Sequence, residues 1–218
     1  MTVVVGIVPA GGSGERLGAE RPKAFVVVGG KPMLEYSLGA LESVCDRTVV
    51  AVPEGWQLAV GSSQSVAAVA GGASRSASVR NAVLAAAEAD VFVVHDAARP
   101  LVTAELVERC LGELDGFDAA IAAAPVTDTV KEAGQDGRVL RTLDRSSLWA
   151  IQTPQVFRAD ALRRALDVDE SVLASATDDA SLVEAAGGSV RVVQAPPQNL
   201  KITGPADLRL VEALLGAD

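Results

Sequence analysis

The sequence of 218 residues contains few aromatic side chains and almost no histidine, and both shortages limit its chemistry. Aromatic residues make up 3% of the chain, and His95 is the only imidazole. Nothing in the sequence indicates a Ser/His/Asp triad, and no Cys/His cluster has the spacing of a zinc site. Covalent hydrolase chemistry is therefore disfavoured, which leaves positioning and charge neutralisation as the expected source of rate.

Cysteine, basic charge and long apolar runs are also scarce. Cys45 and Cys110 lie in apolar helical contexts without CxxC spacing, which favours buried thiols in a reducing cytoplasm over a disulfide or metal site. Nineteen Lys and Arg against 28 Asp and Glu give a net charge of −9, which argues against general nucleic-acid binding. No apolar run approaches the ~20 residues of a membrane span, and residues 3–8 lack the features of a signal peptide. We expect a soluble cytoplasmic protein with no nucleic-acid or membrane partner.

Small and branched aliphatic residues are abundant instead, and 49% of the chain is hydrophobic. Strand-like and helix-like runs alternate with short connections, which predicts βαβ units and a largely parallel sheet in an α/β protein. The expected strands cover 2–10, 47–53, 65–71, 91–96, 118–126 and 189–195. The expected helices cover 33–44, 76–89, 104–114, 159–167, 178–187 and 205–215.

The pattern changes between Asp128 and Trp149, where apolar and polar residues alternate on both sides of the turn sequence GQDG. This alternation predicts a β-hairpin. A hairpin with so little apolar surface is not stable alone, so we expect the arm 128–149 to rest on another body, most simply a second subunit. No linker or repeat interrupts the chain, and residues 1–218 are predicted to form one domain with a projecting arm.

The stretch GIVPAGGSGERLGAERPKAF (6–25) joins a short apolar strand to a glycine-rich loop that carries cations. Glycines permit positive φ and let backbone N–H groups converge on an oxyanion. The loop fits neither the Walker A pattern nor the dinucleotide fingerprint, so a merely structural turn is the alternative. Arg16 and Lys23 favour a phosphate loop, because they could neutralise a triphosphate and the charge that develops when its α-phosphorus is attacked. For either cation alone, a solvated charge beside Glu15 or Glu20 would be the preferred interpretation.

Polar segments follow the carboxyl ends of the expected parallel strands, where open sheets of this kind bind ligands. Besides the glycine loop they are GGASRSAS (71–78), HDAARP (95–100) and PVTDTVK (125–131). We expect His95 to be a satisfied core imidazole rather than a catalytic one. Asp96 is the better candidate, as a carboxylate that can touch a ribose or metal-bound water, with N-capping of the following helix as the rival interpretation.

Further polar residues interrupt apolar surroundings later in the chain. Lys201 stands between Leu200 and Ile202 at an expected strand end, where a buried lysine would need an anion, and this indicates a second phosphate. The others are Arg145 in TLDRSSLW, Thr153 in IQTPQ, and Thr177 with Asp178 in SATDDAS.

Taken in order, these segments resemble the 2-C-methyl-D-erythritol 4-phosphate cytidylyltransferases over essentially the whole chain. The segments that carry the resemblance are PAGGSGERLGAERPKAF, AGGASRSASV, VHDAARPLV, APVTDTVK, LDRSSLWAIQTPQVF, ATDDASLVE and NLKITGPADL. The resemblance implies a Rossmann-like fold with helices on both faces of the sheet, a homodimer joined by the arm, and Mg²⁺ bound mainly through the phosphates of CTP rather than by a metal site of the protein. It also implies that CTP and methylerythritol phosphate give 4-diphosphocytidyl-2-C-methyl-D-erythritol and pyrophosphate in the non-mevalonate isoprenoid pathway.

The resemblance also implies roles for residues of this chain. Arg16 and Lys23 would be the catalytic pair that stabilises the pentavalent transition state, and Lys201 would grip the methylerythritol phosphate together with Arg145. The residues implied to line the nucleotide, contact its base or lie near its ribose are Ala10, Gly11, Gly12, Gly72, Ser78, Asp96 and Ala97. Those implied to complete the acceptor pocket are Arg99, Thr129, Thr153 and Thr177. Arg145 lies at the base of the arm and is expected to reach the partner subunit's site.

One departure from the family bears on base recognition, and two other functions compete with this interpretation. Many members carry an acidic residue where this chain has Ala73, so a contact to the cytosine amino group is missing and backbone groups would have to exclude uracil. A ribitol 5-phosphate cytidylyltransferase would share the fold and motifs and differ mainly in the acceptor pocket. A non-catalytic nucleotide-binding regulator is the second alternative, and the presence of both cationic pairs argues against it.

Overall fold

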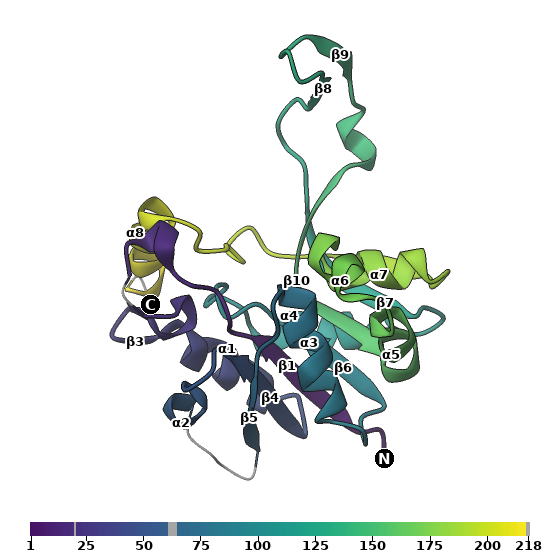
Figure 1. Cartoon of the computed structure of the whole chain (residues 1–218). Coiled ribbons are helices and arrows are strands. Elements are labelled where there is room, and N and C mark those ends of the chain that lie inside the picture. Colours follow the sequence, from purple (N-terminus) through teal and green to yellow (C-terminus); the bar gives the residue numbers. More distant parts are fainter. Residues whose placement is uncertain (20, 61–64, 217–218) are drawn as a thin grey trace.

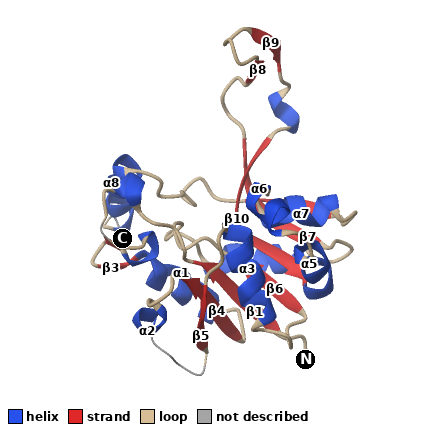
Figure 2. Ribbon diagram, in the orientation of Figure 1, coloured by secondary structure: helices blue, strands red, loops and turns tan. Residues whose placement is uncertain are grey.

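The computed structural model describes residues 1–19, 21–60 and 65–216, and its centre is a seven-stranded sheet with helices on both faces (Figures 1 and 2). The strand order is β11-β7-β10-β6-β1-β4-β5. Neighbouring strands are parallel except at β10, which runs antiparallel to both β6 and β7. The strands are β1 (Val4–Pro9), β4 (Arg47–Val52), β5 (Val66–Ala70), β6 (Val91–Val94), β7 (Ala119–Pro125), β10 (Trp149–Arg158) and β11 (Val190–Gln194).

Two apolar layers enclose this sheet. The helices are α1 (Met33–Glu42), α2 (Gln57–Val60), α3 (Arg75–Leu84), α4 (Ala104–Gly112), α5 (Ala159–Leu166), α6 (Glu170–Ser175), α7 (Asp179–Ala185) and α8 (Pro205–Leu215), with 3-10 turns η1 (Glu15–Leu17), η2 (Lys23–Phe25) and η3 (Arg145–Ser147). Alternate residues of a strand face opposite layers. Phe92 and Val94 of β6 therefore pack with α3, α5, α6 and α7, whereas Val91 and Val93 pack with α1 and α4.

Two short hairpins lie outside the main sheet. The first pairs β2 (Val27–Val28) with β3 (Lys31–Pro32), close to α8. The second pairs β8 (Lys131–Ala133) with β9 (Val139–Thr142) in an arm that projects far from the body (Figure 1). The arm leaves the sheet after β7 and returns through η3 into β10. The predicted hairpin arm is therefore confirmed, and every residue of β8 and β9 is exposed.

The predicted elements are present with small shifts at their ends, and β10 is the main difference. Residues 149–158 were not predicted as a strand, yet they insert between β6 and β7 and make the sheet mixed. The segment WAIQTPQVFR contains a proline and lacks strict alternation, so its sequence alone is a weak strand signal. The short helix α6 was missed for a similar reason, because six residues carry little periodicity.

Both cysteines, Cys45 and Cys110, are free and buried, as predicted. Burial raises the pKa of each thiol to about 12, so neither is a nucleophile near neutral pH. In the part of the chain that is described, no helix is long and apolar enough to cross a bilayer.

Candidate active site

A cleft of about 600 Å³ opens at the carboxyl ends of the parallel strands. Its walls come from the glycine loop after β1, the loop before α3, the segment after β6 and the loop between β11 and α8. The predicted residues that line it are Ala10, Gly11, Gly12, Arg16, Lys23, Gly72, Ser78, Asp96, Ala97 and Lys201. Folding therefore brings together, in one place, the residues implied as catalytic and nucleotide-binding, and Lys201 with them.

The glycine loop presents free backbone amides to this cleft. Gly14 has a φ of 81°, and a Cβ there would meet the carbonyl oxygen of Arg21 at 2.8 Å, so the position requires glycine. Lys23 N donates to Gly12 O at 2.9 Å and folds the loop back on itself. The amides of residues 11–16 have no acceptor among the described residues. Successive free N–H groups of this kind form an oxyanion-binding concavity.

Two cations on this loop lack a counter-ion within the described ranges. Arg16 is exposed on η1, and Lys23 is half-buried at the start of η2. Neither forms an ion pair with any described residue. Burial, together with the like charges of Lys201 and Arg16, lowers the pKa of Lys23 from its ordinary value. An anion entering the cleft would relieve this unfavourable environment, because it favours the charged form of the amine.

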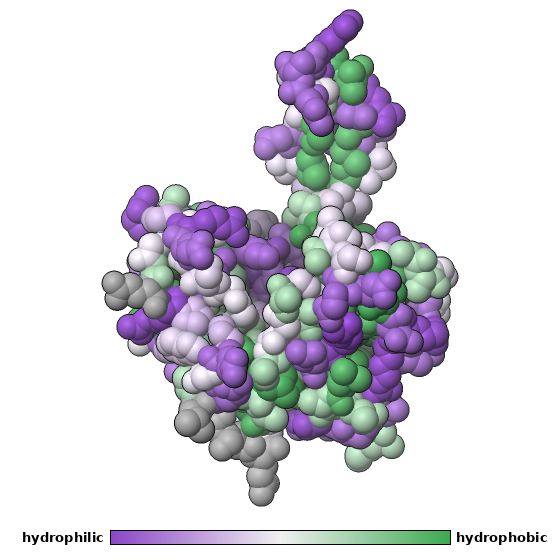
Figure 3. Space-filling model, viewed as in Figure 1, coloured by the Kyte–Doolittle hydropathy of each residue, from purple (hydrophilic) through white to green (hydrophobic). Residues whose placement is uncertain are grey.

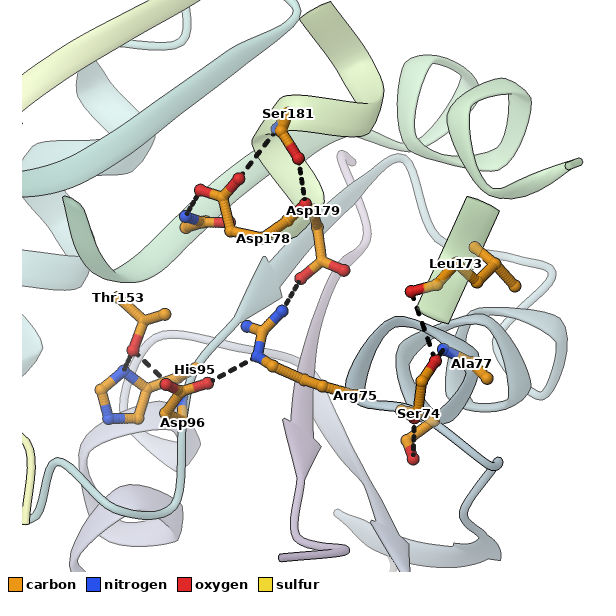
Figure 4. Close-up of polar contacts among 12 residues, drawn as sticks. Ser74, Arg75, Ala77, His95, Asp96, Thr153, Leu173, Asp178, Asp179 and Ser181 are labelled. Atoms are coloured by element: carbon orange, nitrogen blue, oxygen red, sulfur yellow. Dashed lines mark hydrogen bonds and ion pairs between the residues drawn. The ribbon is translucent and has the colours of Figure 1, made fainter. Parts of the chain in front are cut away.

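Asp96 is the centre of an ion-pair network at the end of β6 (Figure 4). Its Oδ1 accepts from Arg75 Nε at 2.9 Å, and its Oδ2 accepts from Lys201 Nζ at 2.7 Å. Burial opposes the charge of Asp96, but the two cations outweigh it and hold the pKa of this carboxyl well below its usual range. Asp96 is therefore an ionised carboxylate that anchors Lys201 at the rim of the cleft.

Arg75 is a site residue that sequence reasoning missed. It begins α3 directly after the N-cap Ser74, and its Nη1 donates to Asp179 Oδ2 at 2.6 Å (Figure 4). Burial works against its charge, yet Asp179 and Asp96 together raise the pKa of Arg75 above its ordinary value. Asp179 itself is fully buried, and burial raises its pKa despite the arginine. The only signal in the sequence was an arginine inside the loop motif 71–78, since its partner lies 104 positions away.

The expectation for Lys201 was wrong, and so was the rival interpretation of Asp96 as a helix cap. Lys201 does not end a strand and is not buried, because β11 stops at Gln194 and Lys201 lies exposed in the loop that leads to α8. The carboxylate of Asp96 supplies its counter-charge. Asp96 does not cap α4 either, because Thr103 is the N-cap and its side chain accepts from Leu106 N at 3.3 Å.

Two residues assigned to the acceptor pocket are buried behind the cleft rather than lining it. Arg99 Nη1 donates to Asn199 O at 2.8 Å, and burial lowers the pKa of this guanidinium. Thr153 lies between Asp96 and His95 (Figure 4). His95 is fully buried, with both ring nitrogens near protein partners, and burial lowers its pKa to about 4. The expectation of a satisfied core imidazole is confirmed.

Three other predicted residues also lie outside the cleft. Thr177 is exposed just before α7. Thr129 and Arg145 belong to the arm, where Arg145 Nη1 donates to the carbonyl oxygen of Thr127. In this chain the arm residues therefore do not reach the cleft of their own body.

Free loop amides, unpaired cations and an ion-paired carboxylate at the strand ends of an α/β fold define a nucleotide-binding transferase. The chain belongs to the 2-C-methyl-D-erythritol 4-phosphate cytidylyltransferase family, whose model matches residues 4–217. The motif resemblance and the Rossmann-like fold class are thus confirmed.

Individual relatives agree with this assignment. A 2-C-methyl-D-erythritol 4-phosphate cytidylyltransferase from Nocardia farcinica is 48% identical over 219 residues, which cover 97% of this chain and 94% of the relative. One from Rubrobacter xylanophilus is 44% identical over 226 residues, covering 100% and 96%. The crystal structure of the enzyme of that name from Thermus thermophilus matches with a TM-score of 0.84 at 36% identity, covering 99% of this chain and 100% of that one.

Proposed function

We propose that this protein transfers the cytidylyl group of CTP to 2-C-methyl-D-erythritol 4-phosphate, giving 4-diphosphocytidyl-2-C-methyl-D-erythritol and pyrophosphate in the non-mevalonate isoprenoid pathway. Family membership over residues 4–217 supports the substrates and the reaction. The structural observation that carries the proposal is one cleft that combines free loop amides and Lys23 with the Asp96–Lys201 pair.

The geometry accounts for the chemistry without a general base. A phosphate oxygen of the acceptor, already anionic near neutral pH, attacks the α-phosphorus of CTP, and the bond to the bridging oxygen of the β-phosphate breaks. Negative charge builds up on the α-phosphoryl oxygens and on the departing pyrophosphate. Arg16 and Lys23 stabilise that charge, because neither forms an ion pair with a carboxylate in the described ranges.

Lys201 binds the phosphate of the acceptor. An ammonium group has three N–H donors, and Asp96 accepts one of them at 2.7 Å. The remaining donors of this exposed lysine are available to phosphate oxygens at the cleft. Asp96 thus fixes the position of the Lys201 ammonium and leaves its other N–H donors able to bind phosphate.

Magnesium fits this site as an ion carried by the nucleotide. The described residues contain no group of three His, Cys, Asp or Glu that could hold a metal, and both oxygens of Asp96 already accept from cations. Triphosphate oxygens and water would supply most of its ligands, because Mg²⁺ keeps several waters and is commonly bound through substrate phosphates. Bound there, it would withdraw charge from the phosphates, while the loop amides and cations of the protein orient them.

The active enzyme is a homodimer in which each arm completes the acceptor site of the other subunit. Support comes from Arg145 and Thr129, which lie on the arm and away from their own cleft. Support also comes from the apolar side chains that the arm leaves exposed (Figure 3). A second copy that receives the arm would bury them. We place the enzyme in the cytoplasm, where free thiols such as Cys45 and Cys110 persist.

Pyrophosphate release with CTP and Mg²⁺ tests the function, with methylerythritol 4-phosphate and ribitol 5-phosphate offered in parallel and Lys23→Ala as the control. We expect release with the first acceptor alone and its loss in the variant. Release with ribitol phosphate would place the error in the acceptor pocket. Release with neither would favour a non-catalytic nucleotide-binding protein. Replacing CTP with UTP tests whether backbone groups near Ala73 exclude uracil, since Ala73 lines the cleft.

A further inference from the structure

A buried hydrogen-bond network lies directly behind the Asp96–Lys201 pair. Its side chains belong to His95, Thr153 and Asn199, which are 0%, 4% and 0% exposed. None of these three lines the cleft. They nevertheless contact the two segments that carry the ion pair, so they are in a position to control its geometry.

The donor and the acceptor can be assigned in each hydrogen bond of the Thr153 hydroxyl. Nε2 of His95 lies 3.2 Å from Arg99 O, and a carbonyl oxygen only accepts, so Nε2 carries the proton. Nδ1 of the neutral ring is then an acceptor, and the Thr153 hydroxyl at 3.1 Å donates to it. The same Oγ1 accepts from Asp96 N at 3.0 Å. The single proton of Thr153 is used inside the protein, and none is left to donate to a substrate.

The contact to Asp96 replaces strand pairing at an irregular place in the sheet. Asp96 lies two residues beyond the end of β6, and its amide has no backbone acceptor among the residues described. On the other side, the register of β10 against β7 shifts between Ile151 and Gln155, and Thr153 lies in that interruption. The hydroxyl of Thr153 therefore satisfies a buried N–H that would otherwise be costly to leave unpaired.

Asn199 joins this network to the loop that carries Lys201. Its Nδ2 donates to the carbonyl oxygen of Thr153 at 2.9 Å. On the far side of Lys201, Ile202 N donates to Ala98 O at 2.8 Å. The lysine is thus held between two anchored residues, with its ammonium 2.7 Å from Asp96.

We propose that Thr153 and His95 are positioning residues for the transfer reaction. They hold the Asp96–Lys201 pair at the cleft through the backbone of Asp96, and Thr153 does not contact the acceptor. This replaces the pocket role that the family resemblance implies for Thr153. The inference rests on the proposed function, because the placement of Asp96 and Lys201 matters to catalysis only if the cleft performs that transfer.

The single histidine of the chain allows a test that is independent of activity. In ¹⁵N-labelled protein, the long-range ¹H–¹⁵N spectrum of His95 is expected to show the Nε2–H tautomer at neutral pH. Thr153→Val removes the donor to Nδ1 and is expected to shift the Nδ1 resonance, whereas Thr153→Ser keeps it near the wild-type position. An Nδ1–H tautomer in the wild-type protein would overturn the inference, and this measurement decides even if Thr153→Val fails to fold.

A double-mutant cycle separates positioning from direct contact with the acceptor. Thr153→Val is expected to lower kcat/KM about tenfold, which corresponds to the free energy of one lost hydrogen bond. Thr153→Ser keeps the hydroxyl and is expected to recover most of that loss. In an Asp96→Ala background the same Thr153→Val change is expected to alter kcat/KM by less than about twofold. The carboxylate through which Thr153 positions Lys201 is then already absent. An undiminished tenfold loss in both backgrounds would mean that Thr153 contacts the acceptor itself, which contradicts the inference.

Failure of the proposed function would look different. A wild-type protein that releases no pyrophosphate would refute the transfer reaction, and the positioning role with it, while the tautomer of His95 would still show whether the network is assembled.

Discussion

Ion pairs in the cleft and ion pairs on the arm are made of the same groups in different surroundings. In the cleft, Arg75 and Asp96 are 29% and 10% exposed in their side chains, whereas on the arm Arg141 and Glu132 are 70% and 45% exposed. An exposed pair contributes about 0–1 kcal/mol, but a desolvated pair strongly penalises the removal of one partner. Removing one partner of the cleft pair should therefore cost much more stability than removing one partner of the arm pair.

Apolar side chains show the same contrast. The body places Phe92 and Phe157 at 0% exposure, while the arm and its stem leave Leu140 at 62% and Trp149 at 38% (Figure 3). Exposing apolar side chains to water is unfavourable, and an exposed apolar patch commonly marks a site of protein–protein contact. The cleft residues are thus assembled within one chain, and the exposed apolar surface of the arm is what supports the proposed dimer.

The largest effect is expected in the cleft, at Lys23. Lys23→Ala removes a cation that faces the developing phosphate charge, so kcat for pyrophosphate release should fall about 10²–10³-fold. Arg21→Ala is the matched control, because Arg21 is an exposed cation of the same segment that does not line the cleft. Equal losses in both variants would point to a general charge effect and contradict the assignment.

The buried network should make stability depend on pH. Burial lowers the pKa of His95 to about 4 from 6.5, so between these values the unfolded state binds a proton that the folded state does not. The stabilisation is fully present above pH ~6.5 and is lost as pH falls toward 4, by about 3 kcal/mol in all. The charged groups that influence the ring are Asp96, Arg99 and Arg75.

Urea unfolding of wild type and His95→Gln between pH 7.5 and 4.5 measures this contribution. The wild-type protein should lose more free energy of unfolding than the variant over that interval. Identical pH profiles would show that burial does not keep His95 neutral in the folded protein.

On the arm, a charge in the apolar surface should weaken association. Leu140→Asp is expected to raise the Kd of the dimer about tenfold or more, because a carboxylate would have to be desolvated in the contact. Leu84→Asp makes the same change at a leucine that is 73% exposed on α3 of the body, and it should leave association unchanged. Sedimentation equilibrium over a concentration series distinguishes the two, and equal behaviour would remove the arm from the interface.

The smallest expected effect is the activity recovered when two inactive variants, one in the arm and one in the cleft, are mixed. Subunits that carry Arg145→Ala lack the arm's arginine, and subunits that carry Lys23→Ala lack the cation of the cleft. If arms complete each other's sites, random mixing should restore about one quarter of wild-type activity, because half of the dimers would hold one intact site. Recovery in the pyrophosphate assay supports a shared site. No recovery would mean that Arg145 acts in its own subunit, and an Arg145→Ala homodimer with wild-type activity would mean that Arg145 has no role.

Local signals account for the parts of the molecule that were predicted. The glycines after β1 and the polar residues after β5 and β6 marked the cleft, because parallel strands place their carboxyl ends at one edge of the sheet. The alternation around GQDG marked the arm. The strand β10 could not be found in this way, because its irregular sequence becomes a strand only through pairing with β6 and β7.

The sequence by itself determined the α/β class, the glycine-rich loop and the family, because periodicity, glycine content and the order of motifs are local properties of the chain. Only the tertiary structure decided what each polar side chain does. It paired Lys201 with Asp96 across 105 positions, brought Arg75 to Asp179, and turned Thr153 inward toward His95. The physical reason is that a hydrogen bond depends on distance and direction in space, and a linear pattern does not specify either for residues so far apart.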